Sequence, residues 1–506
     1  MPTSRSRRLP LPAVAATAAL LLPLTACTAS DGSGASGDAQ RLRVVMAFPP
    51  AQAMSPYGDD AVTLSRLAVI EGLTTLDANG AARPALAASW KQDNPTTWTF
   101  TLRDAVFQDG AKVDADAVVR SLTAAGKASP LPRVLSDTPL TATAVPGGKT
   151  VRIVTKSADP LLPQRLANPS LTILSPDAYA KGRTDPAGHA TGPFTLTGVK
   201  GAVSATLERN DTYWGGKAKA PGVDVTFAAD GTARANALRT KAVDVAEYVP
   251  IAQASLLGDS YVHEFPSART NGLSLNTRRG VFTDPALRAA AREAIDSEAL
   301  VDGVYEGRAD TAKGLLGPGV PWAAGKRTAP TGRTPAASRE EVARTKEIVL
   351  ATYTNRPELP EVATLVQQQL EKRGFTVRQV VRDYAQMEAD ALAGTYDAFI
   401  QARNTLLDTA DPVSYLASDF TCDGSFNISQ LCDRTVDSAV DDAASLSGTD
   451  ARHSAAMAAE AAVLGSDALV PLVHERFVQG YDDARVEGVS LDPLERTLIT
   501  ADTRAG

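Results

Sequence analysis

Three β-rich segments alternate with two helical patterns in the second half of the chain, and this order constrains the fold more than any other feature. The β-rich segments are residues 347–353, 375–381 and 396–402. The first helical pattern has apolar residues at helical spacing from Val362 to Leu370 and stops at Gly374, and the second covers residues 387–392. Strands that alternate with helices at these lengths predict a βαβαβ unit with a parallel sheet and right-handed crossovers.

The loops at the carboxyl ends of these strands are candidate ligand contacts, because open α/β sheets bind ligands at that edge. The three loops span residues 354–358, 382–384 and 403–411. Their charged and aromatic side chains are Arg356, Arg382, Asp383, Tyr384, Arg403, Asp408 and Asp411. We therefore expect a binding site where these loops meet.

The first half of the chain follows a different pattern. Residues 97–102 alternate strictly between polar and apolar, which predicts a half-buried strand. Asp114 is expected to cap a short helix, and residues 140–156 return to β-rich alternation. Near the middle, Asp284 followed by Pro285 marks a helix start, because the aspartate accepts free amides and the proline fits the first turn.

The N-terminus has the parts of a lipoprotein export signal in the expected order. A basic start precedes an apolar stretch from about Leu9 to Leu22, and Leu24-Thr25-Ala26-Cys27 then places a cysteine directly after a small residue. Residues 1–26 are therefore predicted to be a signal peptide, and the mature chain is predicted to begin at Cys27 with lipid on its sulfur. The alternative, a transmembrane helix, is disfavoured by three prolines and a short apolar run. The export route, general secretory or twin-arginine, stays open.

The segment after the lipid anchor predicts a flexible tether, because residues 28–40 are small and polar without apolar periodicity. Residues 27–40 thus form anchor and tether, and we expect the protein on the outer face of the cell membrane. Loss of the three signal-peptide arginines changes the formal charge from −7 to −10, so a nucleic-acid partner is not expected. Roughly 460 residues remain for the folded part, enough for two or three domains.

Two further cysteines, Cys422 and Cys432, lie in the exported part, where thiols oxidise. We predict a disulfide between them, which would stabilise the fold by roughly 2.5 to 3 kcal/mol. The alternative is two unpaired thiols. A bare metal site is not expected, because the four histidines are scattered without ligand spacing, and no cofactor motif occurs.

Beyond these local patterns, the chain resembles the family 5 extracytoplasmic solute-binding proteins of peptide and nickel ABC importers. The blocks that carry the resemblance keep their order over most of the mature chain. They are residues 71–77, 84–90, 98–103, 107–110, 191–194, 207–210, 213–216, 275–277 and 294–296. Each block alone predicts only turns and core aromatics, so the specificity lies in their ordered recurrence.

The resemblance implies an α/β, two-lobed periplasmic-binding-protein fold with a hinge and an additional domain inserted in the N-terminal lobe. Two chain crossings, near Thr270 and near Val478, would form the hinge. The implied boundaries are residues 41–64, 186–270 and 478–506 for lobe I, 65–185 for the inserted domain and 271–477 for lobe II. A monomer is expected.

The resemblance also implies roles for the loop residues. In the family's peptide binders an aspartate before an Asp-Pro or Glu-Pro step holds the ligand's ammonium, and Asp408 occupies that position here. Asp408 has a local alternative as a helix cap or turn residue, whereas Asp411 is interpreted as the cap. The local sequence around Arg356 is more similar to relatives that bind nickel complexes than to the peptide binders, and the same holds for Arg403 and Asn404. In such a site the two arginines would bind carboxylates of the ligand. Each arginine has the alternative of an ion pair.

These implications favour a binding protein that captures oligopeptides or dipeptides and delivers them to ABC permease subunits. The alternative ligand is a nickel or other metal chelate in the same cleft. No GxSxG, HExxH or Walker motif occurs, so neither an enzyme nor the transporter's ATPase is expected. A signalling lipoprotein that keeps the fold without importing a solute is a third alternative.

Overall fold

The computed structural model describes residues 40–129, 131–135, 138–180, 182–406 and 409–506. Every described element belongs to one compact unit, Ala39–Gly506. Cys27 and Asp408 both lie outside the described residues. Within the described ranges no helix combines the length and apolar character needed to cross a membrane.

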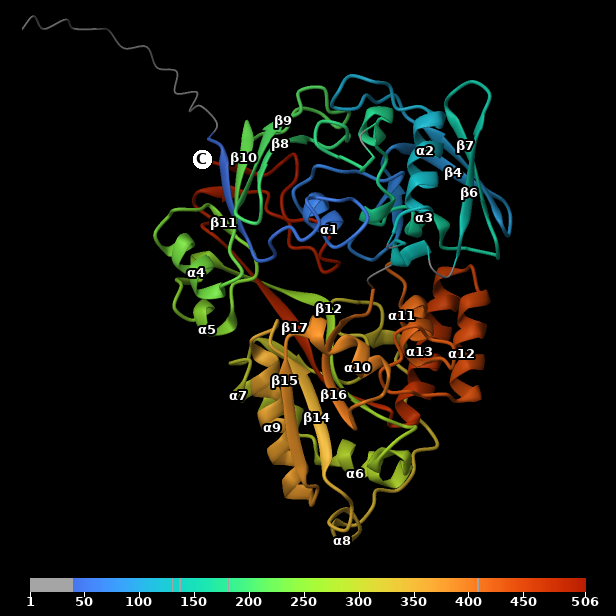
Figure 1. The fold of residues 1–506 in the computed structure, drawn as a ribbon, viewed down its shortest axis with the longest axis vertical. Helices are drawn as coiled ribbons and strands as arrows, with labels where there is room; N and C mark the ends of the chain where they lie inside the picture. Colours follow the sequence, from blue (N-terminus) through green and yellow to red (C-terminus); the bar gives the residue numbers. More distant parts are fainter. Residues whose placement is uncertain (1–39, 130, 136–137, 181, 407–408) are drawn as a thin grey trace, which may run out of the picture. The chain divides into compact units, whose positions relative to one another are not determined.

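One large mixed sheet organises this unit, and its strand order is not the order of the sequence (Figure 1). A further strand, β13 (Ala309–Thr311), pairs with β17. In spatial order the sheet runs β15 (Val377–Arg382), β14 (Ile348–Tyr353), β16 (Ala398–Asn404), β12 (Val262–Leu275), β17 (Leu469–Tyr481), β11 (Val245–Ala246), β1 (Leu42–Met46), β10 (Gly222–Phe227), β9 (Ser204–Arg209) and β8 (Phe194–Lys200).

The predicted βαβαβ unit is confirmed at one end of this sheet. Strand β14 pairs in parallel with both β15 and β16. The helix between β14 and β15 is α9 (Glu358–Arg373), which ends at Gly374 with φ of +116° in the left-handed region that glycine tolerates. The second helix is α10 (Glu388–Leu392).

The third strand lies two residues later than predicted, which corrects the assignment of Arg403 and Asn404 to a loop. Both residues belong to β16, where they pair with Thr270 and Arg269 of β12. The sequence window placed the strand at residues 396–402 by its β-rich composition. The neighbouring strand extends it to Asn404, because pairing with β12 satisfies the backbone groups of two polar residues.

Strands β12 and β17 cross the middle of the unit as a long antiparallel pair (Figure 1). One end of β17 pairs with β11, and the carboxyl half of β12 pairs with β16. The two strands therefore join the β15–β14–β16 end of the sheet to the β1–β10–β9–β8 end. Thr270 lies within β12 and Val478 within β17.

A separate antiparallel sheet, β4 (Ala87–Asn94), β5 (Thr97–Leu102), β7 (Thr150–Thr155) and β6 (Leu140–Val145), lies beside α2 (Ala115–Ala125). The strand predicted at 97–102 is confirmed. The indole of Trp98 is buried in the core of this sheet and donates to the carbonyl of Asp159 at 3.1 Å. Asp114 caps α2 as predicted by accepting the amide of Ala117.

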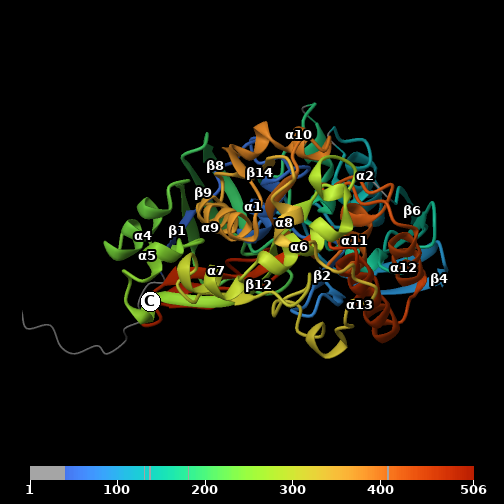
Figure 2. The ribbon, with the colours of Figure 1, turned by 90° about the horizontal axis from the view of Figure 1, so that it is seen from below.

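Cys422 and Cys432, in the last third of the chain, form a disulfide, as predicted from the sequence. It joins the end of α11 (Pro412–Phe420) to the start of α12 (Arg434–Ser445). Figures 1 and 2 both show α12 side by side with α13 (Thr449–Gly465). Asp411 caps α11 as interpreted, because its carboxylate accepts the amide of Val413 at 2.9 Å.

The remaining elements are short. Helix α6 starts at its predicted Asp284 cap, whose carboxylate accepts the amide of Ala286. Gln40, assigned to the tether from sequence, instead pairs with Ala505, so the two ends of the described chain meet. The α-helices and strands whose bounds have not yet been given are α1 (Asp60–Arg66), α3 (Leu162–Arg165), α4 (Gly231–Arg239), α5 (Ile251–Ala254), α6 (Pro285–Ala294), α7 (Ser297–Gly303), α8 (Arg339–Val342), β2 (Thr74–Leu76), β3 (Ala82–Pro84), β18 (Val486–Glu487) and β19 (Arg504–Ala505).

Candidate functional site

A cavity of about 370 Å³ lies beside β17, between the loop that follows β14 and the loops that follow β1, β10 and β11. Its walls come from the segments that follow the parallel strands β1, β10, β11 and β14, because each chain leaves the sheet at its carboxyl edge. The lining residues lie in segments 47–49, 229–234, 248–251, 354–358 and 475–478, together with Tyr305. The site therefore collects loops from both ends of one sheet.

Aromatic rings form much of its apolar wall. The Tyr248 ring meets the Phe477 ring edge-on at 4.7 Å between centroids and the Phe48 ring at 5.9 Å. Phe48 is half exposed, whereas Tyr305 is fully buried. Tyr248 has φ of +46°, a conformation that costs backbone energy for a residue with a side chain and is held by the surrounding contacts.

Charged groups line the same cavity. Arg356 donates to a carboxylate oxygen of Glu475 at 3.0 Å, so a residue from the predicted loop pairs with a residue of β17. Glu358 is the first residue of α9 and also faces the cavity. Burial and the nearby Glu475 carboxylate raise the pKa of Glu358, and the backbone amide of Glu358 together with Arg356 only partly offsets them.

A buried carboxylate, Glu495, organises the polar core next to the cavity. It lies in the C-terminal segment after β18 and is 8% exposed. Burial alone would raise the pKa of Glu495, but the guanidinium groups around it lower that pKa overall. Its carboxylate oxygens accept hydrogen bonds from Arg269 at 2.8 Å, Asn404 at 2.9 Å and Tyr248 at 3.1 Å, and they form an ion pair with Arg66 at 3.4 Å.

The network extends from Glu495 toward the amino end of the chain. Arg66, at the end of α1, also donates to the carboxylate of Glu247 at 3.0 Å. Glu247 in turn accepts the amide of Ala47, which follows β1. Because Tyr248 is part of both the network and the cavity wall, the network fixes the position of the wall.

The predicted site residues have different locations. Arg356 lines the cavity. Arg403 is buried in β16, pairs with Asp419 at 2.7 Å and lies 4.5 Å from the centre of the Phe426 ring. Asn404 binds Glu495, as described above. Arg403 and Asn404 are not among the residues that line this cavity.

The second predicted loop also lies away from this cavity. Tyr384 begins the 3₁₀ turn Tyr384–Gln386, where its ring meets that of Tyr353 edge-on at 4.9 Å. Arg382 ends β15 and is exposed. A ligand contact from Asp408, Arg403, Asn404, Tyr384 or Arg382 therefore stays a prediction.

Sequence reasoning missed Glu358, Glu475, Tyr248 and Glu495. Glu358 belongs to the first predicted loop, so its position at the carboxyl end of β14 was a usable signal. The other three residues lie in segments whose local sequence gives no sign of a site. Only the order of the strands in the sheet places them at the cavity or in its network.

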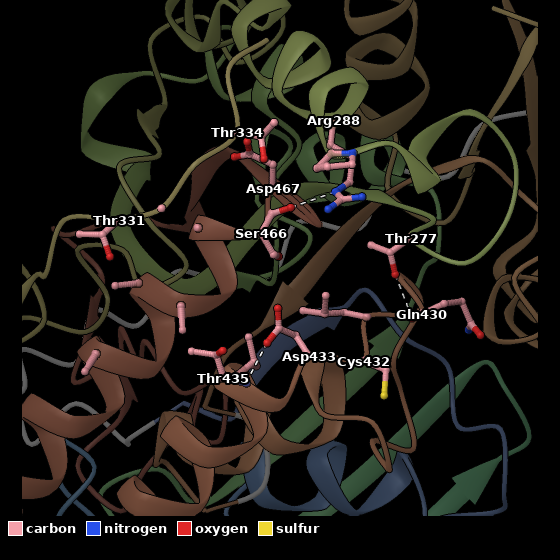
Figure 3. Close-up of a pocket in the computed structure, with 18 of the residues that line it drawn as sticks. Thr277, Arg288, Thr331, Thr334, Gln430, Cys432, Asp433, Thr435, Ser466 and Asp467 are labelled. Atoms are coloured by element: carbon pink, nitrogen blue, oxygen red, sulfur yellow. Dashed lines mark hydrogen bonds between the residues drawn. The ribbon is translucent and has the colours of Figure 1, made fainter. Parts of the chain in front are cut away.

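A larger cavity, of about 670 Å³, lies elsewhere (Figure 3). It is bounded by α6, residues 328–334, the start of α12 and the end of α13, and its lining is rich in threonine. Arg288 there donates to the carbonyl of Ser466 at 2.9 Å and to the carbonyl of Phe282 at 2.8 Å. This cavity contains none of the predicted ligand residues, and all of its walls come from residues 277–467.

Comparisons with known proteins agree with this architecture. Residues 81–427 match the family model described as bacterial extracellular solute-binding proteins, family 5 Middle. The nickel-binding protein NikA of Staphylococcus aureus is 27% identical over 344 residues, which cover 64% of this chain and 67% of that protein. The glutathione-binding protein GsiB of Salmonella paratyphi A is 29% identical over 354 residues, with 67% and 69% covered.

Solved structures share the fold. NikA from Staphylococcus aureus in complex with Ni(L-His)2 superposes with a TM-score of 0.76 at 22% identity, covering 92% of this chain and all of that one. The binding protein DppA from Helicobacter pylori in complex with the peptide STSA gives a TM-score of 0.72 at 20% identity, covering 92% and 98%.

Proposed function

Because the chain belongs to the bacterial extracellular solute-binding proteins of family 5, we propose that it captures peptides outside the cell and delivers them to the permease subunits of an ABC importer. Its α/β fold is that of the two-lobed periplasmic binding proteins. The observation that carries the proposal is the cavity beside β17, whose volume suits a small organic ligand and whose walls come from both ends of the sheet. Members of this family bind solutes, and no catalytic step is proposed.

A metal chelate is the second candidate ligand. The relatives include a glutathione-binding protein and a nickel-binding protein, and the two solved structures described above hold a peptide and a nickel–histidine complex. Both kinds of ligand offer carboxylates and amines, which suits a cavity lined by Arg356, Glu358 and Glu475. The peptide is favoured, because a peptide carries a free ammonium that a carboxylate can pair with, whereas the amines of a chelate are bound to its metal.

The lobe boundaries given above are also proposed for this chain. Three hydrophobic cores, which surround Leu350, Val44 and Phe100, support a division into three parts. These residues fall in proposed lobe II, lobe I and the inserted domain, respectively. The core around Val44 also takes in residues from both edges of the proposed inserted domain, namely Leu67, Val69, Ile70, Leu174 and Ala178. Strands β12 and β17 would then form the hinge, and a ligand that touches both lobes would stabilise the closed form.

Native mass spectrometry of the purified protein tests the function. A co-purified mass that matches a short peptide supports peptide capture, and a nickel isotope pattern with an organic ligand supports the chelate. If neither a peptide nor a chelate binds to the ligand-free protein in calorimetry, the importer function is rejected. Neighbouring genes for two permeases and two ATPases would argue against a signalling lipoprotein.

Asp408→Asn is expected to weaken peptide binding by about tenfold or more, because a dehydrated ligand ammonium would lose its charged partner. The substitution keeps the side-chain shape. The ligand-induced rise in melting temperature should shrink accordingly, since that rise follows affinity by mass action. Equal rises for the wild type and Asp408→Asn would identify Asp408 as a turn residue and move attention to Arg403 and Arg356.

Cys27→Ser is expected to move the protein from the membrane fraction to the soluble fraction. The physical reason is that the proposed lipid on Cys27 is the anchor, and serine cannot carry it through a thioether. Cell fractionation followed by immunoblotting measures the distribution. A serine variant that stays in the membrane fraction would disprove the lipoprotein interpretation.

A further inference from the structure

Glu358 differs from Glu475, the other carboxylate that lines the cavity beside β17, because the described structure gives the Glu358 side chain no side-chain partner, whereas Glu475 is paired with Arg356. Glu358 stands at the first position of α9 and is one of the residues that line the cavity. Arg234, on α4 at the other end of the sheet, is near enough to influence it electrostatically. A carboxylate in such a place is costly to bury unless a cation approaches it.

The cations of the cavity are already engaged. Arg356 is paired with Glu475 at 3.0 Å. Arg476 is paired with Asp310, with one contact of 2.9 Å. Arg234 is buried and donates to the backbone carbonyl oxygens of Ala228, Ala229, Glu247 and Tyr248 at 2.7–2.9 Å. None of these three guanidinium groups therefore serves as a direct partner for Glu358.

The aromatic wall offers a second attraction for a cation. Phe48, Tyr248 and Phe477 form a continuous edge-to-face series along the cavity. The π-face of an aromatic ring attracts an ammonium or guanidinium group, and the attraction grows when water is excluded. A carboxylate next to a group of aromatic rings is a combination that selects an organic cation over a neutral or anionic group.

We infer that this cavity receives a basic side chain of the ligand, a lysine ammonium or an arginine guanidinium, with Glu358 as its counter-ion and Phe48, Tyr248 and Phe477 around its alkyl stem. The inference rests on the proposed peptide-binding function and names the ligand class. The cation neutralises Glu358, which among the described carboxylates that line this cavity is the one without a side-chain partner. A glutamate or aspartate side chain in the same place would meet Glu358 and Glu475 and be repelled.

Calorimetry with matched tripeptides tests the inference on the full protein after removal of co-purified ligand. The probes are Ala-Lys-Ala, Ala-norleucine-Ala and the nickel–histidine complex. The wild type is expected to bind the lysine peptide about tenfold or more tightly than the norleucine peptide, since a charge-assisted contact is gained. N-acetylated versions separate the contribution of the terminal ammonium from that of the side chain.

Two variants test whether Glu358 causes the preference for the lysine peptide. In Glu358→Gln the ratio of the affinities for the lysine and norleucine peptides is expected to fall to about one. Glu361→Gln is the matched control, because Glu361 is exposed in the same first turn of α9 and does not line the cavity. It is expected to keep the wild-type preference. Melting temperatures of both variants check that they are folded.

The outcomes separate this inference from the proposed function. Equal affinity of the wild type for the two peptides, or a lysine preference that survives in Glu358→Gln, overturns the inference while peptide binding stands. Binding of the nickel–histidine complex alone overturns the inference and selects the chelate. If no probe binds, both the inference and the proposed function are rejected.

Discussion

Replacing Glu495 by alanine is expected to lower the free energy of unfolding by about 3–5 kcal/mol, because the guanidinium groups of Arg66 and Arg269 would lose a buried counter-charge. Both arginines contact the Glu495 carboxylate directly, at 3.4 and 2.8 Å. The loss would also free Tyr248, whose hydroxyl donates to Glu495 and whose ring lines the cavity. Chemical denaturation followed by circular dichroism measures the change.

Glu487→Ala serves as the control for that measurement. Glu487 lies in the same C-terminal part of the chain and pairs with Arg504 at 2.7 Å, but both side chains are exposed. An exposed pair is worth about 0–1 kcal/mol. Equal losses for the two variants would contradict the role of the buried network.

The contribution of Glu495 should also depend on pH. The pKa of Glu495 in the folded protein lies below its ordinary value of 4.5. A carboxyl group with a lowered folded-state pKa contributes stability that is fully present above the unfolded pKa and is lost as the pH falls through the folded pKa. The stability difference between wild type and Glu495→Gln should therefore be constant near neutral pH and shrink below about pH 4.5. A difference that grows on acidification would contradict the assignment.

Asp419→Ala is expected to destabilise the protein by about 3–5 kcal/mol, because it strips the buried Arg403 of its carboxylate partner. The two side chains make a bidentate contact, with distances of 2.7 and 2.8 Å. Asp423→Ala is a suitable control, since Asp423 is exposed in the segment just after α11. Denaturant unfolding compares the two variants.

A double variant distinguishes a structural pair from a ligand anchor. Replacing Arg403 by Met and Asp419 by Leu together should recover much of the loss, because an apolar pair of similar volume carries no desolvation cost. If Asp419→Ala instead keeps its stability and loses ligand affinity in calorimetry, Arg403 belongs to the binding site, as the loop pattern predicted.

The sequence determined features that depend on neighbours within a few residues. The βαβαβ unit follows from the spacing of apolar residues between 347 and 402, and the caps at Asp114, Asp284 and Asp411 follow from side chains that reach the next amides. The disulfide follows from two cysteines ten positions apart in an exported chain. Each of these features depends on residues close together in the chain, so it can be predicted without knowing the tertiary structure.

The tertiary structure alone decided which charges meet. Glu495 contacts Arg66, a residue 429 positions away, and Arg356 pairs with Glu475 at a separation of 119. These contacts form because β12 and β17 lie in the middle of the sheet and connect its two halves. No local sequence pattern encodes this strand order. The partner of a buried charge is set by where the strands lie, since an ion pair forms between groups within about 4 Å of each other regardless of their distance along the chain.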